Sequence, residues 1–234
     1  MSAATLSVHQ RAIRSSVVKK ALIAITGLVL IAFLVMHMVG NLKVFLGQSS
    51  YDAYAQWLNK DFFYPVLPHG WFIWVFRLVL VACLVVHIWL TVKLWHVSAE
   101  AQGGKYVRTK RKQQTVAVRI MRWGGVALFL LILFHLLMFT TGTITPGFAY
   151  DRSDPYSMYV GAFKLWWVFL VYVVFLALVF FHVRHGFWSA LTTLGANVSA
   201  TARAVLNVLA YVLSAVLFLG FLLPPFAVLI GWVG

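Results

Sequence analysis

The chain has 234 residues, of which 62% are hydrophobic and only 10% are charged, whereas soluble proteins average about 45–50% apolar and about 25% charged residues. Its 19 Lys and Arg residues outnumber five acidic residues and give a net charge of +14. This composition excludes a soluble globular protein and indicates an integral membrane protein, because lipid is the solvent that so much apolar surface requires. The single cysteine, Cys83, excludes a disulfide framework and any iron–sulfur cluster held by this chain alone.

Five apolar stretches are long enough to cross the hydrocarbon core of a bilayer, which takes about 20 helical residues. They cover residues 18–46, 70–96, 117–142, 160–190 and 204–232. Pro224 and Pro225 predict that the last stretch breaks in its final turns, because proline lacks the N–H that a helix uses. We therefore expect an all-α fold in which residues 1–234 form one bundle of five transmembrane helices.

Two connections, about 43–69 and 143–159, have room for further structure. In the first, apolar and aromatic side chains recur every three to four residues, which predicts a short amphipathic helix. These side chains are Tyr51, Tyr54, Ala55 and Leu58, and the segment 64–68 ends the pattern. Such a helix would lie along the outer membrane interface, either as an ordinary connector or as a lid over a site.

The basic residues gather in the connections on one side of the membrane. With the N-terminus in the cytoplasm, most Lys and Arg residues lie inside, including a cluster at 105–112. Four of the five acidic residues then lie outside, namely Asp52, Asp61, Asp151 and Asp154. The positive-inside rule thus predicts a cytoplasmic N-terminus and an outer C-terminus. A basic membrane face without a base-stacking pattern argues against nucleic-acid binding. The cluster at 105–112 is either a topology signal or a docking surface for an acidic partner.

Each of the first four spans contains one histidine deep in its apolar run: His37, His87, His135 and His182. At a rise of about 1.5 Å per residue, His37 and His135 lie roughly 24–26 Å from the inner edge. The second and fourth spans run the other way, so His87 and His182 lie roughly 24–26 Å from the outer edge. This predicts an outer pair, His37 with His135, and an inner pair, His87 with His182, separated by roughly 15–20 Å.

Two depth-matched histidine pairs are what two b-type haems, each with two imidazole ligands, would require. No Cys-x-x-Cys-His motif is present, so covalently attached c-type haem is excluded. Another metal ion fits less well because neither level supplies a carboxylate or a thiolate, and a proton relay would need Asp or Glu within the spans. His185, three residues after His182, could replace it as the ligand.

Several motifs resemble those of one known family. They are SVVKKALIAITG at 16–27, HMVGNL at 37–42, RWGGVALFLLILFH at 122–135 and HVRHGFWSALTTLG at 182–195. With these motifs the chain resembles the cytochrome b558-type dihaem membrane anchors, or C subunits, of succinate dehydrogenase and related fumarate reductases. The resemblance covers nearly all of the four histidine-bearing spans. In one departure, Phe180 stands where some dihaem fumarate reductases have a glutamate, so proton coupling by that route is not expected.

The resemblance implies a function and a setting. The chain would be the anchor subunit, without the catalytic head, of a succinate:quinone oxidoreductase, which is respiratory complex II of the tricarboxylic acid cycle. Its four histidines would bind two haem b groups in the cytoplasmic membrane of a bacterium. A flavoprotein with FAD and an iron–sulfur subunit would bind on the cytoplasmic face, in a complex that could form higher oligomers. Electrons would pass from succinate through the haems to a membrane quinone, with menaquinone expected.

Arg77 is a cation within the second span, where an unpaired charge is costly. We expect it either to contact a propionate of the outer haem or to extend to the membrane surface. Lys93, Arg122 and Arg184 could contact propionates of the inner haem, although all three are also placed as ordinary inner-edge residues.

A quinone site needs an apolar slot and polar groups near the quinone carbonyls. The outer level offers Asn41, Lys43 and Tyr54, with Gln48 and Tyr51 nearby, whereas the inner level offers Ser16, Lys19, His96 and Arg119. We favour the outer level, because two haems in series are useful only if electrons must reach a distant acceptor. Two other functions remain open: a dihaem cytochrome b of a nitrate reductase or hydrogenase, and a haem-free transporter.

Overall fold

A computed structural model describes residues 15–100 and 112–234, apart from the side chains of 98–100 and 112–120. Every element in these ranges is a helix. In chain order they are α2 (Ser16–Leu42), the short 3-10 helix η1 (Lys43–Leu46), α3 (Gln48–Lys60), α4 (Trp71–Glu100), α5 (Lys112–Phe139), α6 (Pro155–Phe163), α7 (Trp166–Thr193) and α8 (Ala200–Leu229). The basic segment 105–111 and the side chain of Arg119 lie outside this description.

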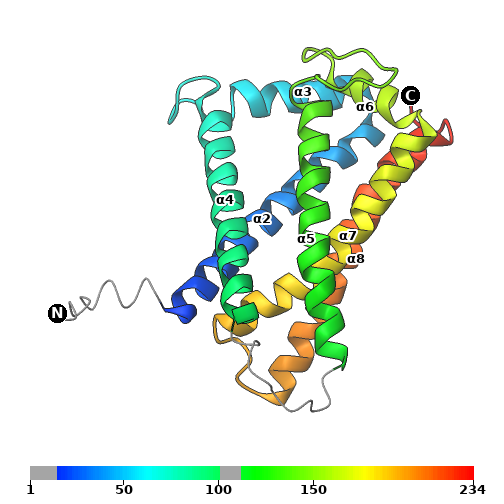
Figure 1. The fold of residues 1–234 in the computed structure, drawn as a ribbon. Helices are drawn as coiled ribbons and strands as arrows, with labels where there is room; N and C mark the ends of the chain where they lie inside the picture. Colours follow the sequence, from blue (N-terminus) through cyan, green and yellow to red (C-terminus); the bar gives the residue numbers. More distant parts are fainter. Residues whose placement is uncertain (1–14, 101–111) are drawn as a thin grey trace.

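Within the described residues, five helices are long and apolar enough to cross a membrane, as the sequence predicts. They are α2 with η1 (Ser16–Leu46), α4 (Trp71–Val97), α5 from Met121 to Phe139, α7 (Trp166–Thr193) and α8 (Ala200–Leu229). Helix α2 runs obliquely through the bundle and packs against α4, α7 and α8, while α5 packs against α7 (Figure 1). We call the end with α3 and α6 the upper end, and the end where α2 begins the lower end.

The fourth span begins later than the predicted residue 160. Residues 160–163 belong to α6, a separate helix that starts where the Asp154 side chain accepts a hydrogen bond from the Ser157 amide and Pro155 takes the first turn. Leu165 is extended and separates α6 from α7. The apolar side chains from Met158 to Phe163 are buried in the protein core of the upper end.

The last span does not break at its proline pair. Helix α8 continues through Pro224 and Pro225 to Leu229, and both prolines are buried. Ala227 and Val228, in the turn that follows, are also almost completely buried. Tertiary packing thus holds the final turns of α8 in place, as neighbouring helices do for proline in other transmembrane helices.

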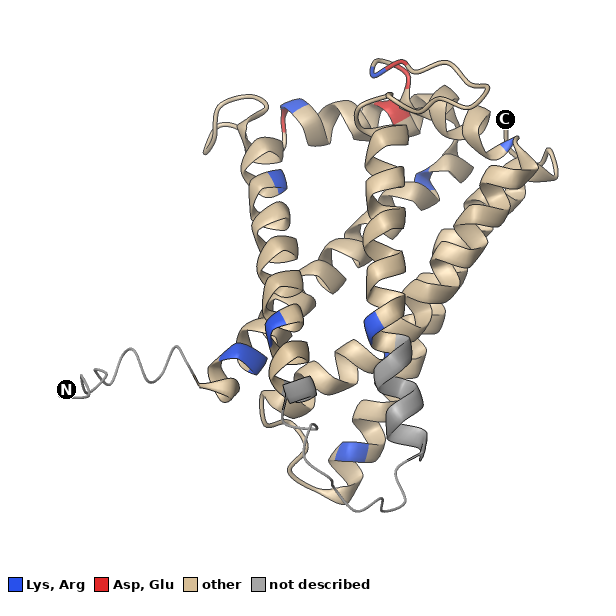
Figure 2. Ribbon diagram, in the orientation of Figure 1, with Lys and Arg blue, Asp and Glu red and all other residues tan. Residues whose placement is uncertain are grey.

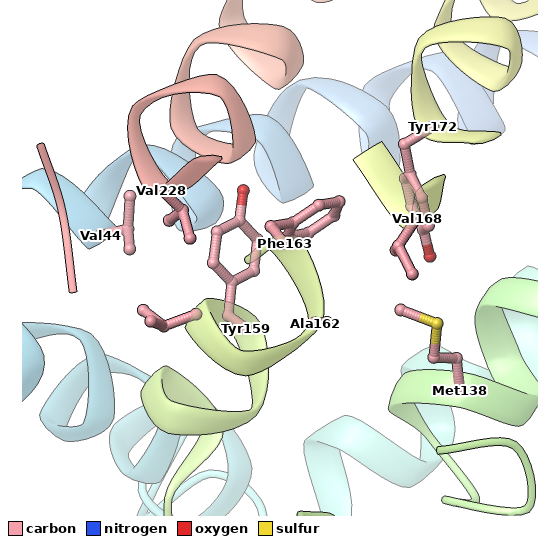
Figure 3. Close-up of a cluster of buried hydrophobic side chains, with 9 residues drawn as sticks. Val44, Met138, Tyr159, Ala162, Phe163, Val168, Tyr172 and Val228 are labelled. Atoms are coloured by element: carbon pink, nitrogen blue, oxygen red, sulfur yellow. The ribbon is translucent and has the colours of Figure 1, made fainter. Parts of the chain in front are cut away.

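The upper end forms a layer across the bundle. The predicted amphipathic helix is present as α3 and lies along this end (Figure 1). Two hydrogen bonds join α3 to the start of α6: the Tyr156 amide donates to Asp52 Oδ1 (3.0 Å), and Gln48 Nε2 donates to Asp154 Oδ2 (3.2 Å). Beneath them lies the main hydrophobic cluster, drawn in Figure 3, which joins η1, α5, α6, α7 and α8.

The described charges are divided unequally between the two ends. All four described acidic side chains lie at the upper end, in or beside α3 and the loop before α6 (Figure 2). At the lower end the described charged side chains are Lys and Arg only (Figure 2). This distribution matches the charge asymmetry expected from the sequence. Which end faces the cytoplasm remains a prediction.

Candidate functional site

The structure brings together the two histidine pairs that the sequence predicts. His37 on α2 and His135 on α5 have ring centres 5.9 Å apart, with planes at 86°. His87 on α4 and His182 on α7 have ring centres 6.4 Å apart, with planes at 58°. We call them the outer pair and the inner pair. Each pair joins two spans that lie far apart in the chain.

The spacing within each pair suits two ligands of one iron. A metal–imidazole nitrogen bond is about 2 Å long, and the ring centre lies about 1 Å beyond the nitrogen. Two imidazoles on opposite sides of one metal ion therefore have ring centres about 6 Å apart. Both observed separations, 5.9 and 6.4 Å, are close to this value.

The two pairs lie at different depths in the bundle. Tyr172, which contacts His135 of the outer pair, precedes His182 of the inner pair by ten residues on α7. Thr26, which contacts His87 of the inner pair, precedes His37 by eleven residues on α2. At about 1.5 Å per residue these intervals correspond to about 15 and about 17 Å along the two helices. Both agree with the separation expected from the sequence.

In the inner pair, the His87 ring has hydrogen-bond partners and the His182 Nδ1 atom has none. Nδ1 of His87 lies 3.2 Å from the Ile23 carbonyl oxygen and 3.2 Å from Thr26 Oγ1. A carbonyl oxygen only accepts, so the bond to Ile23 places the proton of His87 on Nδ1 and leaves Nε2 with a free lone pair. Nδ1 of His182 is buried and has no hydrogen-bond partner.

Glycine at position 27 makes room for the inner pair. A Cβ atom there would lie 3.2 Å from Cε1 of His87, closer than ordinary van der Waals contact. A Cβ at Gly125 would lie 3.9 Å from Cε1 of His182, which is an ordinary contact. The close approach of α2 to His87 therefore depends on the absence of a side chain at Gly27. The approach of α5 to His182 depends less on Gly125.

His185 does not lie in either pair. Its ring faces Trp188 at 6.5 Å on the same helix. The geometry thus favours His182 over His185 as the residue opposite His87.

The outer pair lies among aromatic side chains. His37 stacks on Phe33 at 5.2 Å and contacts Phe221 at 5.7 Å. His135 contacts Phe139 at 5.4 Å, and its Nδ1 lies 2.9 Å from the hydroxyl oxygen of Tyr172. Sequence reasoning did not single out Tyr172 or Thr26. The available signal for Tyr172 was a phenol inside an apolar span at the depth of the outer pair.

Three of the four cations predicted to contact a propionate lie against tryptophan rings. Arg77 lies over Trp74 at 5.1 Å with both residues exposed, and exposed Lys93 lies over Trp89 at 3.8 Å. Arg122 lies over Trp95 at 5.0 Å. For Arg77 this exposed position fits extension to the membrane surface, the second alternative given above. Propionate contacts for these three residues remain predictions.

Arg184, the fourth cation named for a propionate contact, donates a hydrogen bond from Nη2 to Asn207 Oδ1 on α8 (3.0 Å), and its guanidinium lies over the Tyr211 ring. It therefore joins α7 to α8 on the helix face turned away from His182.

The predicted outer quinone residues lie where α2 ends. Lys43 Nζ lies over the Tyr54 ring at 5.0 Å, and that ring covers Gly40, one turn after His37. Asn41 Nδ2 donates to the His37 carbonyl oxygen (2.8 Å), so its amide is engaged within its own helix. An open hollow of about 440 Å³ also lies at the upper end and is lined by Phe45, Leu223, Trp232 and Val233. Asn41, Lys43 and Tyr54 do not line it.

Comparisons with protein-family models, with curated proteins and with solved structures each gave no match. The function of the protein is therefore inferred from the residues of this chain.

Proposed function

We propose that this chain is a dihaem cytochrome b that carries electrons across a membrane. The observation that supports it is the presence of two histidine pairs, each with ring centres about 6 Å apart, on four spans and at two depths. Two histidines would hold each haem iron, and the porphyrin would supply its remaining ligands. A bare zinc ion would need further protein ligands, and no group of three or more His, Cys, Asp or Glu side chains gathers in the part of the chain that the structure describes.

The protein's part in this function is ligation and orientation. His37 and His135 would hold one haem iron, and His87 and His182 the other. The bond from His87 Nδ1 to the Ile23 carbonyl fixes the tautomer in which Nε2 can bind a metal. Bound haem supplies reversible one-electron transfer, while the surrounding aromatic and aliphatic side chains exclude water and influence its potential.

We further propose that the chain is the membrane anchor of a succinate:quinone oxidoreductase in a bacterial cytoplasmic membrane. The support is the set of four motifs that carry the family resemblance, together with the basic lower end, which would be cytoplasmic. A flavoprotein and an iron–sulfur subunit would bind there. Electrons would enter beside His87 and His182 and leave beside His37 and His135, where menaquinone would be reduced near Lys43 and Tyr54.

The first experiment tests haem binding. The purified chain should give a dithionite-reduced minus oxidised spectrum of b-type haem, and a pyridine haemochrome assay should give two haems per chain. Protein purified from haem-replete cells without any haem would refute the proposal and leave the transporter alternative. One haem per chain would refute one of the two pairs.

The second experiment tests the anchor assignment. A tagged chain purified from its native membrane should bring with it a flavoprotein and an iron–sulfur subunit, and the complex should reduce a menaquinone analogue with succinate. Retention of nitrate reductase or hydrogenase subunits instead would show that the chain serves another respiratory enzyme. The mass of the complex would also give its oligomeric state.

A further inference from the structure

Tyr172 lies at the outer pair and is enclosed by aromatic rings. Its side chain is 9% exposed, and its ring contacts Phe163 at 5.0 Å, Phe175 at 5.9 Å and Phe139 at 6.3 Å. Figure 3 shows it on α7 near Val168, with its hydroxyl turned towards Met138 on α5, the helix that carries His135. That hydroxyl lies 2.9 Å from His135 Nδ1.

Metal binding would fix the direction of this hydrogen bond. A neutral imidazole binds a metal through the lone pair of one nitrogen and carries its proton on the other. If His135 binds iron through Nε2, its Nδ1–H must donate and the Tyr172 oxygen must accept. Such a contact orients the ring and makes the imidazole a stronger electron donor to the metal.

The same arrangement occurs at the inner pair with the helices exchanged. Helix α2 supplies the outer histidine His37, and its Ile23 carbonyl accepts from the inner histidine His87. Helix α7 supplies the inner histidine His182, and its Tyr172 contacts the outer histidine His135. Helices α2 and α7 pack directly against each other. Each of the two thus carries one ligand for one pair and one hydrogen-bond partner for the other.

We propose that Tyr172 is a positioning residue that orients His135 and lowers the reduction potential of the outer haem. This proposal rests on the proposed dihaem function. Electron donation from an imidazole whose N–H is hydrogen-bonded stabilises the oxidised iron more than the reduced iron. The outer haem therefore has a lower potential with the phenol oxygen present than without it.

The test is a potentiometric titration of the Tyr172→Phe protein, which keeps the ring and its aromatic contacts and removes only the hydroxyl. We expect two haems per chain and an upward shift of one midpoint potential. For a one-electron couple, a tenfold weaker preference for the oxidised state corresponds to an upward shift of about 59 mV in the midpoint potential. The component that is absent from the His37→Ala protein identifies the outer haem. Tyr159→Phe is the matched control, because Tyr159 is buried in the same cluster but its ring contacts are Tyr51 and Phe163.

A second variant keeps the proposal testable if the Tyr172→Phe protein accumulates poorly. Site-specific replacement of Tyr172 by 3-fluorotyrosine keeps the hydroxyl and makes its oxygen a poorer acceptor, so a smaller upward shift of the same component is expected. Unchanged potentials in either variant, or equal shifts with Tyr159→Phe, would overturn the proposal. Failure of the dihaem function itself would be seen separately, as wild-type protein without two haems.

Discussion

At the lower half of α7, His182 and His185 lie within one helical turn, and only their surroundings distinguish them. His182 faces His87 across the bundle at 6.4 Å, whereas His185 faces Trp188 on its own helix. The buried Nδ1 of His182 has no hydrogen-bond partner. A buried polar atom without a partner is costly, so Nδ1 of His182 does not stabilise the fold through a hydrogen bond.

Replacement of any one of the four paired histidines by Ala should therefore remove one haem, because an iron with one protein ligand is held weakly. His185→Ala should keep both haems and is the matched control for His182→Ala. Pyridine haemochrome assays of the purified variants measure the outcome. Loss of a haem in the His185→Ala protein would transfer the ligand role from His182 to His185.

Gly27 provides a second test at the inner pair. Gly27→Ala places a Cβ atom 3.2 Å from Cε1 of His87, so the ring must move by a few tenths of an ångström. We expect up to about tenfold weaker retention of the inner haem, as for other changes next to a metal ligand. Gly124→Ala is the control, because nothing lies within 4 Å of its added Cβ. Haem content after dialysis against apomyoglobin measures retention, and equal retention in both variants would contradict this packing argument.

At the scale of elements, α6 depends on its N-cap. Hydrogen bonds from the side chain and backbone of Ser157 lower the pKa of Asp154, and Gln48 lowers it further. The folded pKa thus lies below the ordinary value of about 3.9. The capping contribution is therefore complete above that value and is lost as the pH falls through the folded pKa.

Asp154→Ala should speed hydrogen exchange of the first-turn amides of α6 at neutral pH, because Ser157 loses its acceptor. Asp154→Asn keeps a side-chain oxygen and should change exchange much less. Asp151→Ala is a further control, since Asp151 accepts from Ser153 before the helix begins. Equal protection in the Ala and Asn proteins would show that packing alone holds α6.

The junction of α2, η1 and α3 is where we expect quinone reduction. Lys43→Ala and Tyr54→Phe proteins that retain both haems should reduce quinone more slowly with succinate, because Lys43 and Tyr54 meet one turn beyond His37. Ser16→Ala and His96→Ala at the lower end are the controls. Normal turnover in the first two variants together with lost turnover in the controls would move the site to the lower end.

At the scale of the whole molecule, the charge asymmetry predicts where partners bind. Changing Lys110, Arg111 and Lys112 to Glu should weaken retention of the catalytic subunits in a pull-down, because the basic end would face them across the membrane surface. Reversal of Lys60, Arg152 and Lys164 at the other end is the matched control. Equal retention in both triple variants would leave the basic cluster as a topology signal only.

Hydropathy and helical rise were enough for much of this architecture. Each span must be apolar along its length, so the positions of the apolar runs predict five spans, and the described part of the chain contains five such helices. The depth of His37, His87, His135 and His182 follows from counting residues, because the rise per residue is nearly constant. The same counting could not separate α6 from α7, since residues buried in a protein core and residues facing lipid are equally apolar.

Rotation about each helix axis and the choice of neighbours were decided only by tertiary packing. The sequence does not show that Tyr172 reaches His135, that the Ile23 carbonyl meets His87, or that α8 continues through Pro224 and Pro225. These features depend on how side chains of different helices fit together, and hydropathy carries little information about that fit in spans that are apolar on every side. The sequence thus determined how deep each histidine lies, and the fold determined what each histidine faces.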